Sequence, residues 1–285
     1  MKLLSYTIDG RPSYGVEVPG GLLDLGRRLG AEWPTLKQLI AAGELGRVHA
    51  LLKTRPDTQR EDVVLLPVLP DPGAIVCIGL NYEEHRAETA RPVAPHPTVF
   101  LRIAESLQAH DAPLLIPRES TQFDYEGELA LVIGKAGRRI AERDAWDHIA
   151  GVSCFNDGSV RDWQSHTHQF GPGKNFPLTG AFGPALVTPD ELPADRVLQL
   201  HTRVNGRVVQ QARTDQMIFP VPRLVAYVST FMTLQPGDVI VTGTPGGVGA
   251  KRQPPLWLVD GDEVEVEISH VGLLRNRCMK EGEAA

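Results

Sequence analysis

Residues 123–134, FDYEGELALVIG, have the pattern of a β-strand that carries two acids. Apolar residues fill the second half of the stretch and β-branched residues lie near its end, as is typical of strands. Glu126 and Glu128 are two positions apart, and side chains two apart on a strand point to the same face. We therefore expect the two carboxylates to lie close together.

Two neighbouring carboxylates on a half-buried strand need a positive partner. At ~4 Å and an effective dielectric constant of ~20, two like charges repel by about 4 kcal/mol. A shared proton, a Lys or Arg side chain, or a hard divalent cation would relieve that repulsion. The alternative is that Glu126 and Glu128 are solvated side chains on an exposed face, and this stretch alone leaves both interpretations open.

Composition excludes several classes of protein. The 285-residue chain has a net charge of −6, which argues against nucleic-acid binding because nucleic-acid-binding proteins usually present a basic face. No apolar run approaches the ~20 residues of a membrane helix, and the first ten residues show no signal peptide. Cys77, Cys154 and Cys278 lie far apart without a CxxC motif, as expected for a protein of the reducing cytoplasm.

The order of expected elements predicts two domains. A hairpin at residues 2–18 and helical spacing at 36–53 precede prolines at 67, 70 and 72, where we place the domain boundary. The predicted domains are therefore a small α+β domain at 1–70 and a catalytic domain at 71–285. Strands outnumber helices in the second domain, so we predict an α+β fold that is mostly β. The expected strands are 74–78, 98–103, 113–116, 125–134, 149–156, 185–187, 198–204, 238–242 and 263–268, and the expected helices are 81–88, 142–147 and 221–233.

A third acid, Asp157, follows the expected strand at 149–155. An Asp before a glycine is often a turn residue, so alone it indicates little. Together with Glu126 and Glu128 it would form a set of oxygen ligands suited to Mg²⁺ or Mn²⁺. His166 and His168 could imitate a zinc pair, but a polar loop is the simpler interpretation.

Three further features are ambiguous by themselves. His85 and Glu88 have i, i+3 spacing, which suits either a general base with its orienting carboxylate or an ordinary surface pair. Lys174, in GPGKNF, is either a solvated loop lysine or a counter-charge for a substrate carboxylate. The loop at 243–249, GTPGGVG, lacks a nucleotide-binding pattern, but its backbone N–H groups and the Thr244 hydroxyl could approach an anion.

Eight pieces of sequence in order resemble the fumarylacetoacetate hydrolase family across roughly residues 70–276. They are IGLNYEEHRAE, FLRIAESL, FDYEGELALVIG, AGVSCFNDGSVRDWQ, GKNFPLTGAFGPALVT, VNGRVVQ, FMTLQPGDVIVTGTPGGVG and DGDEVEVEISHVGLLRN. The resemblance implies a mixed β-sandwich or β-roll with a small N-terminal domain, and a homodimer. It also implies that Glu126, Glu128 and Asp157 bind Mg²⁺ or Mn²⁺.

The resemblance assigns further roles by position. His85 and Glu88 match a water-activating dyad on a lid segment, and residues 82–96 are expected to be mobile without ligand. Lys174 matches a catalytic or substrate-binding position. Substrate binding is also assigned to Arg102, Arg161, Gln164 and Thr244.

Some positions depart from the family pattern. The segment FLRIAESL replaces a common Lys, Pro and Ser, so Arg102 alters one pocket wall, and Asn175 and Val160 replace a common Ser and Ala. None of these positions is a ligand or part of the dyad. The chemistry is therefore expected to be retained while the choice of substrate is open.

The implied activity is hydrolysis of a C–C bond in an anionic 2-oxo or 2,4-dioxo acid such as an acylpyruvate or fumarylpyruvate. Three carboxylates and one divalent cation sum to −1, so the substrate would need Lys174, with Arg161 as a second candidate, for binding. The alternative on the same site is a tautomerase, isomerase or decarboxylase of the oxaloacetate or hydroxymuconate type. A non-catalytic binding protein is a third alternative, against which the complete set of acids and dyad argues.

Overall fold

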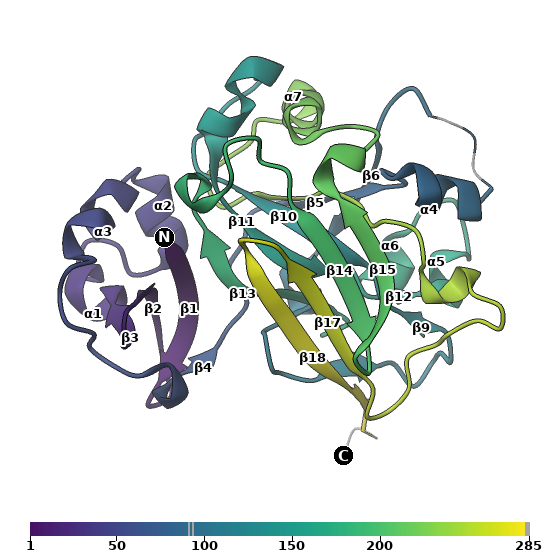
Figure 1. Cartoon of the computed structure of the whole chain (residues 1–285), viewed down its shortest axis with the longest axis horizontal. Helices are drawn as coiled ribbons and strands as arrows, with labels where there is room; N and C mark the ends of the chain where they lie inside the picture. Colours follow the sequence, from purple (N-terminus) through teal and green to yellow (C-terminus); the bar gives the residue numbers. More distant parts are fainter. Residues whose placement is uncertain (91, 93, 283–285) are drawn as a thin grey trace.

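The computed structural model describes residues 1–90, 92 and 94–282, which form two large sheets and one short one. The largest sheet has eleven strands, and its main path runs β3-β2-β1-β13-β11-β10-β16-β5-β6. A five-stranded sheet, β15-β14-β17-β18-β8, packs over part of it (Figure 1). The prediction of a mixed fold that is mostly β is confirmed.

The N-terminal part contains the expected hairpin. Its elements are β1 (Lys2–Ile8), β2 (Arg11–Val18), β3 (Gly21–Asp24), α1 (Leu25–Leu29), α2 (Leu36–Ala41), α3 (Leu45–Leu51) and β4 (Val64–Leu65). Asp9 and Gly10 both have positive φ at the hairpin turn, as two-residue turns that match strand twist require. Gly43, with a φ of 72°, separates α2 from α3, so the helical spacing at 36–53 forms two helices.

The N-terminal strands continue the large sheet. Strand β1 pairs with β13 (Gly180–Val187), with Leu3 opposite Leu186. The backbone ladder therefore crosses the boundary that the sequence predicts near residue 70. Division into two domains at that point stays a prediction.

The centre of the large sheet is buried on both faces. Beyond β13 lie β11 (Ile149–Asn156), β10 (Gly127–Ile133), β16 (Val239–Val241), β5 (Ile75–Gly79) and β6 (Thr98–Arg102), and β7 (Leu107–Gln108) pairs with β13. All residues of β10 are buried. Leu129 and Leu131 pack toward the five-stranded sheet, whereas Ala130 and Val132 pack in a second cluster with N-terminal residues. Burial on both faces explains the nearly continuous apolar sequence of β10.

The second sheet includes two strands that the sequence did not predict. Its members are β8 (Leu114–Ile116), β14 (Gln199–Val204), β15 (Arg207–Arg213), β17 (Glu263–Ile268) and β18 (Gly272–Lys280). Strands β15 and β18 were missed. In β18 the inward positions include Asn276, which donates to the carbonyl oxygens of Ala109 and Ala112. A polar residue at a buried position hides the apolar alternation on which strand prediction depends.

The predicted strand at 123–134 is interrupted. Strand β9 (Phe123–Asp124) pairs with β12 (Ser159–Val160), and β10 begins only at Gly127. The remaining helices are α4 (Glu83–Glu88), α5 (Arg161–Gln164), α6 (Gly171–Lys174) and α7 (Val221–Phe231). The expected helix at 142–147 is a 3₁₀ helix. The 3₁₀ segments are Arg60–Asp62, Ala104–Ser106, Glu142–His148, Pro189–Glu191, Thr214–Gln216 and Gly249–Lys251.

Candidate active site

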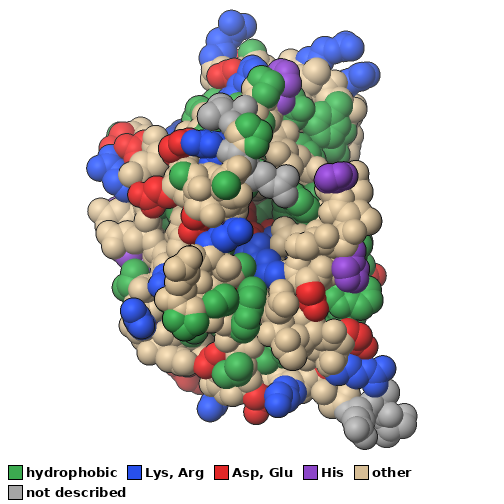
Figure 2. All heavy atoms as spheres, turned by 90° about the vertical axis from the view of Figure 1, so that its right-hand side faces the viewer, with side chains coloured by type: hydrophobic (Ala, Val, Ile, Leu, Met, Phe, Trp, Pro, Cys, Tyr) green, Lys and Arg blue, Asp and Glu red, His purple; other side chains and the backbone are tan. Residues whose placement is uncertain are grey.

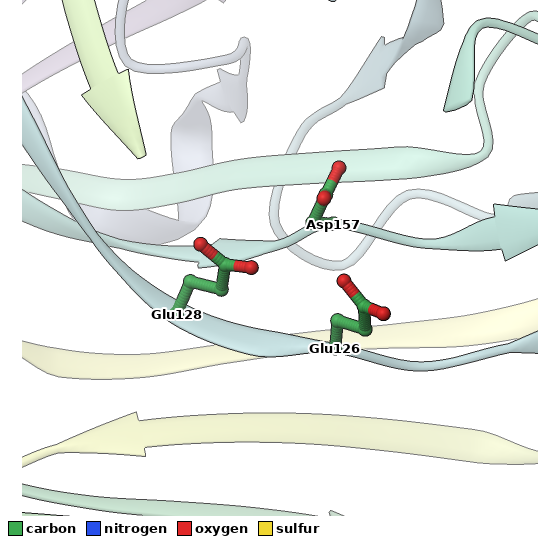
Figure 3. Close-up of side chains that lie close together, drawn as sticks. All are labelled: Glu126, Glu128 and Asp157. Atoms are coloured by element: carbon green, nitrogen blue, oxygen red, sulfur yellow. The ribbon is translucent and has the colours of Figure 1, made fainter. Parts of the chain in front are cut away.

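The three predicted acids meet at the ends of two neighbouring strands. Glu128 lies on β10, Glu126 immediately before it, and Asp157 immediately after β11. The pairing of Gly127 with Asn156 sets this register. One carboxylate oxygen from each acid lies within 4.8 Å of the others, and Figure 3 shows the three side chains converging. All three are buried, so the alternative of solvated glutamates is wrong.

A buried lysine lies among these acids. Lys174, at the end of α6, is 1% exposed. Its Nζ donates to Glu126 Oε2 at 2.7 Å, Asp157 Oδ2 at 2.6 Å and Ser159 Oγ at 2.7 Å. Burial opposes the charged ammonium, but the carboxylates of Asp157 and Glu126 outweigh it and raise the pKa of Lys174. Lys174 is therefore a counter-charge inside the acidic cluster, and the alternative of a solvated loop lysine is wrong.

Two arginines hold the same acids from outside. Arg102 Nη1 donates to Asp157 Oδ1 at 2.6 Å, and Arg161 Nη1 pairs with Glu126 Oε1 at 2.7 Å. Burial works against ionised Glu126, but the charges of Lys174 and then Arg161 lower its pKa. Glu126 is thus held as a carboxylate, and ion pairs with Arg102 and Lys174 fix the position of Asp157.

The local charge differs from the sequence estimate of −1. A fourth buried acid, Asp124, accepts from Arg161 Nε at 2.8 Å, so four acids face three basic side chains: Lys174, Arg102 and Arg161. Adding a divalent cation would make this set net +1. The estimate of −1 counted only the three ligands and the cation, whereas this set adds Asp124 and three basic side chains.

The acids fit a hard divalent cation. Glu128 makes no ion pair within the described residues, and its carboxylate accepts from the Gly243 N–H at 2.5 Å. Burial, reinforced by the charges of Asp157 and Glu126, raises its pKa well above the usual range. A cation beside Glu128 would provide the missing counter-charge. Because every candidate ligand is a carboxylate, Mg²⁺ or Mn²⁺ suits the set better than Zn²⁺.

The predicted dyad is present on α4. His85 Nδ1 lies 2.7 Å from Glu88 Oε1, and Glu88 Oε2 accepts from the Gly247 N–H at 2.9 Å. A carboxylate at Nδ1 holds the proton there and leaves Nε2 as the proton acceptor. Residues 91 and 93 of the expected lid at 82–96 lie outside the described part of the chain, and lid mobility stays a prediction.

A cavity of about 840 Å³ connects Glu126 and Glu128 to His85, whereas Asp157 and Glu88 lie behind its described lining. Its walls include Glu126, Glu128, His85 and Lys174. The predicted substrate-binding residues Arg161, Gln164 and Thr244 also line it, as do His166 and His168. In Figure 2, which looks onto the side of the molecule that carries α4 and α5, basic side chains gather near the middle of the face.

The structure separates the residues that line the cavity from those that lie behind them. Arg102 is buried and bonded to Asp157 and Ser106, and it is absent from the described cavity lining. This position favours holding Asp157 over contacting substrate. Asp124 was overlooked, although the alternation Asp124, Glu126, Glu128 in the quoted stretch was a usable signal.

Residues 74–279 match the family described as fumarylacetoacetate (FAA) hydrolase C-terminal. The chain belongs to the fumarylacetoacetate hydrolase family. A mitochondrial oxaloacetate tautomerase of Xenopus laevis is 38% identical, covering 97% of this chain and 89% of that protein. The solved fumarylacetoacetate hydrolase of Exiguobacterium antarcticum is 33% identical with a TM-score of 0.84, covering 99% of this chain and 100% of that one.

A third member of the family is a maleylpyruvate hydrolase of Sphingobium sp. SYK-6, solved in complex with manganese(II) and pyruvate. It is 28% identical with a TM-score of 0.83, covering 99% of this chain and 100% of that chain. The buried acids and this complex support a divalent-metal site in the present family member. Within the described residues, no helix has the length and apolar character needed to cross a membrane.

Proposed function

We propose that this protein is a metal-dependent enzyme that moves a proton on an anionic 2-oxo acid, with keto–enol tautomerisation of oxaloacetate as its principal reaction. The observation that carries the proposal is the buried cluster of Glu126, Glu128 and Asp157, whose two glutamates line the same cavity as His85 of the His85–Glu88 dyad. The similarity to oxaloacetate tautomerases along nearly the whole chain supports this reaction in preference to hydrolysis.

Cation binding would use the three acids. Glu126, Glu128 and Asp157 would hold Mg²⁺ or Mn²⁺, which acts as a Lewis acid toward the oxygens of a 2-oxo acid. Lys174 holds Glu126 and Asp157 in place. Arg161 and Gln164, bonded to each other at 2.9 Å, supply positive charge and hydrogen bonds on the adjoining wall.

His85 acts as the general base that transfers the proton. Its Nε2 takes a proton from the carbon beside the 2-oxo group and returns it to oxygen, and the reverse sequence ketonises the enol. Glu88 holds the Nδ1 proton and stabilises the imidazolium that forms. The backbone N–H of Gly247 holds the other Glu88 oxygen, so the dyad has a fixed orientation.

Hydrolysis of an acylpyruvate is the second candidate. The cavity of about 840 Å³ exceeds the needs of a four-carbon acid, because pockets for drug-sized ligands measure roughly 300–1,000 Å³. His85 would then deprotonate a water that attacks the distal carbonyl, and cleavage of the C–C bond would leave pyruvate. The solved relative that holds manganese and pyruvate is a hydrolase, which supports this alternative.

The decisive experiment compares the candidate reactions under matched metal conditions. Loss of enol-oxaloacetate absorbance is followed with Mg²⁺ or Mn²⁺, beside a panel of acylpyruvates and fumarylpyruvate with products identified by mass. His49→Ala, at an exposed remote histidine, is the control for His85→Ala, and metal without protein gives the background rate. Tautomerisation that His85→Ala abolishes supports the proposal. If oxaloacetate tautomerises only at the background rate while acylpyruvates are cleaved rapidly, the function is hydrolysis and not tautomerisation. Release of carbon dioxide would indicate decarboxylation.

Assembly and compartment remain proposals as well. The family resemblance implies a homodimer, which light scattering on the purified protein tests directly. A cytoplasmic location, suggested by three free buried cysteines, is tested by fractionation of cells that express the native chain.

A further inference from the structure

Asp124 accepts four hydrogen bonds behind the cavity wall, two of them from Ala250 and Arg161, which line the cavity. It is fully buried, and its Oδ1 accepts from the backbone N–H groups of Tyr125 and Gly249, each at 2.8 Å. Its Oδ2 accepts from the Ala250 N–H at 3.0 Å and from Arg161 Nε at 2.8 Å. One carboxylate therefore joins the segment at 249–250, which forms a cavity wall, to the arginine beside the acids.

Of the two terminal nitrogens of Arg161, Nη1 is bonded to protein acceptors and Nη2 is not, among the described residues. Nη1 contacts Glu126 Oε1 at 2.7 Å and Gln164 Oε1 at 2.9 Å. Nη2 has no hydrogen-bond partner among the described residues although it is buried. A buried guanidinium N–H without an acceptor is costly, and Arg161 lines the cavity. An oxygen of a bound anion would satisfy this nitrogen.

We infer that Asp124 is a positioning residue that orients Arg161 so that Nη2 remains available to the anionic group of the substrate. This inference rests on the proposed function, which supplies a 2-oxo acid as the ligand. The hydrogen bond from Arg161 Nε to Asp124 fixes the rotation of the guanidinium. Without Asp124, Nε loses its partner and the guanidinium can turn all of its donors toward Glu126.

Replacement by asparagine isolates this role. Asp124→Asn keeps the shape of the side chain but leaves one acceptor oxygen and places an NH₂ group among four donors. We expect pyruvate to bind to the Mn²⁺-loaded variant roughly tenfold more weakly, the usual effect of losing one charge-assisted contact. The affinity for Mn²⁺ alone should change by less than about threefold, because Asp124 is not among the clustered ligands. Titration calorimetry measures both affinities without turnover, so failure of the proposed reaction and failure of this inference are distinguishable.

Asp238→Asn is the matched structural control. Asp238 is also buried and also accepts from backbone N–H groups, those of Ala74 at 2.8 Å and Gln235 at 2.7 Å, but it does not line the cavity described here. Its replacement should lower the unfolding temperature and leave pyruvate affinity unchanged. An equal loss of pyruvate affinity in both variants would show that Asp124 acts only through stability.

A double-mutant cycle tests whether the effect passes through Arg161. Arg161→Lys keeps the charge but cannot make the same set of contacts. If Asp124 acts through Arg161, the double variant should bind pyruvate no more than about twofold more weakly than Arg161→Lys alone. Additive losses, unchanged pyruvate affinity in Asp124→Asn, or an equal loss of Mn²⁺ affinity would overturn the inference. If Asp124→Asn does not fold, pyruvate affinity is measured in Arg161→Lys alone. Unchanged pyruvate affinity in that variant would overturn the inference.

Discussion

Removal of the buried Lys174 ammonium should destabilise the metal-free protein strongly. Lys174→Met preserves much of the side-chain length but leaves Glu126 and Asp157 without the cation that now lies 2.7 and 2.6 Å away. Breaking one side of a buried ion pair costs about 3–5 kcal/mol. Because the lysine side chain is 1% exposed, solvent screening reduces this cost little.

The expected change is large enough for a thermal assay. One kcal/mol shifts the unfolding temperature by about 2–4 °C in chains of 150–250 residues, so a fall of roughly 6–20 °C is expected in a chelator. Mg²⁺ or Mn²⁺ would replace part of the lost positive charge. The rise in unfolding temperature on adding metal should therefore be larger in Lys174→Met than in the wild type.

Lys53→Met is the control, because Lys53 is exposed and surface changes usually stay within about 0.5 kcal/mol. A shift in Lys174→Met no larger than that of the control would refute the counter-charge role. Kinetics address the separate prediction that Lys174 holds the substrate carboxylate. In that case Lys174→Ala should raise KM roughly 10- to 150-fold and spare kcat, whereas unchanged constants would remove Lys174 from substrate binding.

The remaining predictions concern the metal, the dyad and the lid. A chelator should abolish turnover, and Mg²⁺ or Mn²⁺ should restore it better than Zn²⁺; full activity in the chelator would contradict the metal assignment. His85→Ala should lower kcat by roughly 10²–10⁴ with unchanged Mn²⁺ affinity, and Glu88→Gln should act in the same direction; an equal loss of Mn²⁺ binding would make His85 a ligand or a structural residue. Amides of helix α4 should exchange faster in the free protein than with Mn²⁺ and pyruvate, and equal exchange rates would argue against a lid.

The local pattern of the sequence was sufficient for the centre of the site. Two-residue spacing put Glu126 and Glu128 on one side of the chain, and their carboxylates do lie together. The i, i+3 spacing of His85 and Glu88 predicted a contact that the structure contains at 2.7 Å. The dyad prediction succeeded because helix periodicity fixes the relative directions of near neighbours, and Glu126, one residue before β10, still lies beside Glu128.

Periodicity could not predict contacts between residues that are far apart in the sequence. Nothing in the composition of GPGKNF shows that Lys174 lies against Glu126, 48 positions away, or that Arg102 reaches Asp157, 55 positions away. Likewise, the addition of β1 to β13 joins Leu3 to Leu186. Such contacts depend on how strands from distant parts of the chain come together.

The sequence by itself therefore determined which acids and which dyad this protein carries, together with a mostly β fold and its family. The tertiary structure decided which cation neutralises which acid, and it brought Asp124 and three basic side chains into the cluster, which a sum over the ligands and the metal alone leaves out. The physical reason is that periodicity acts over a few residues, whereas the electrostatics of a buried site sum over every charge that the fold brings within a few ångströms.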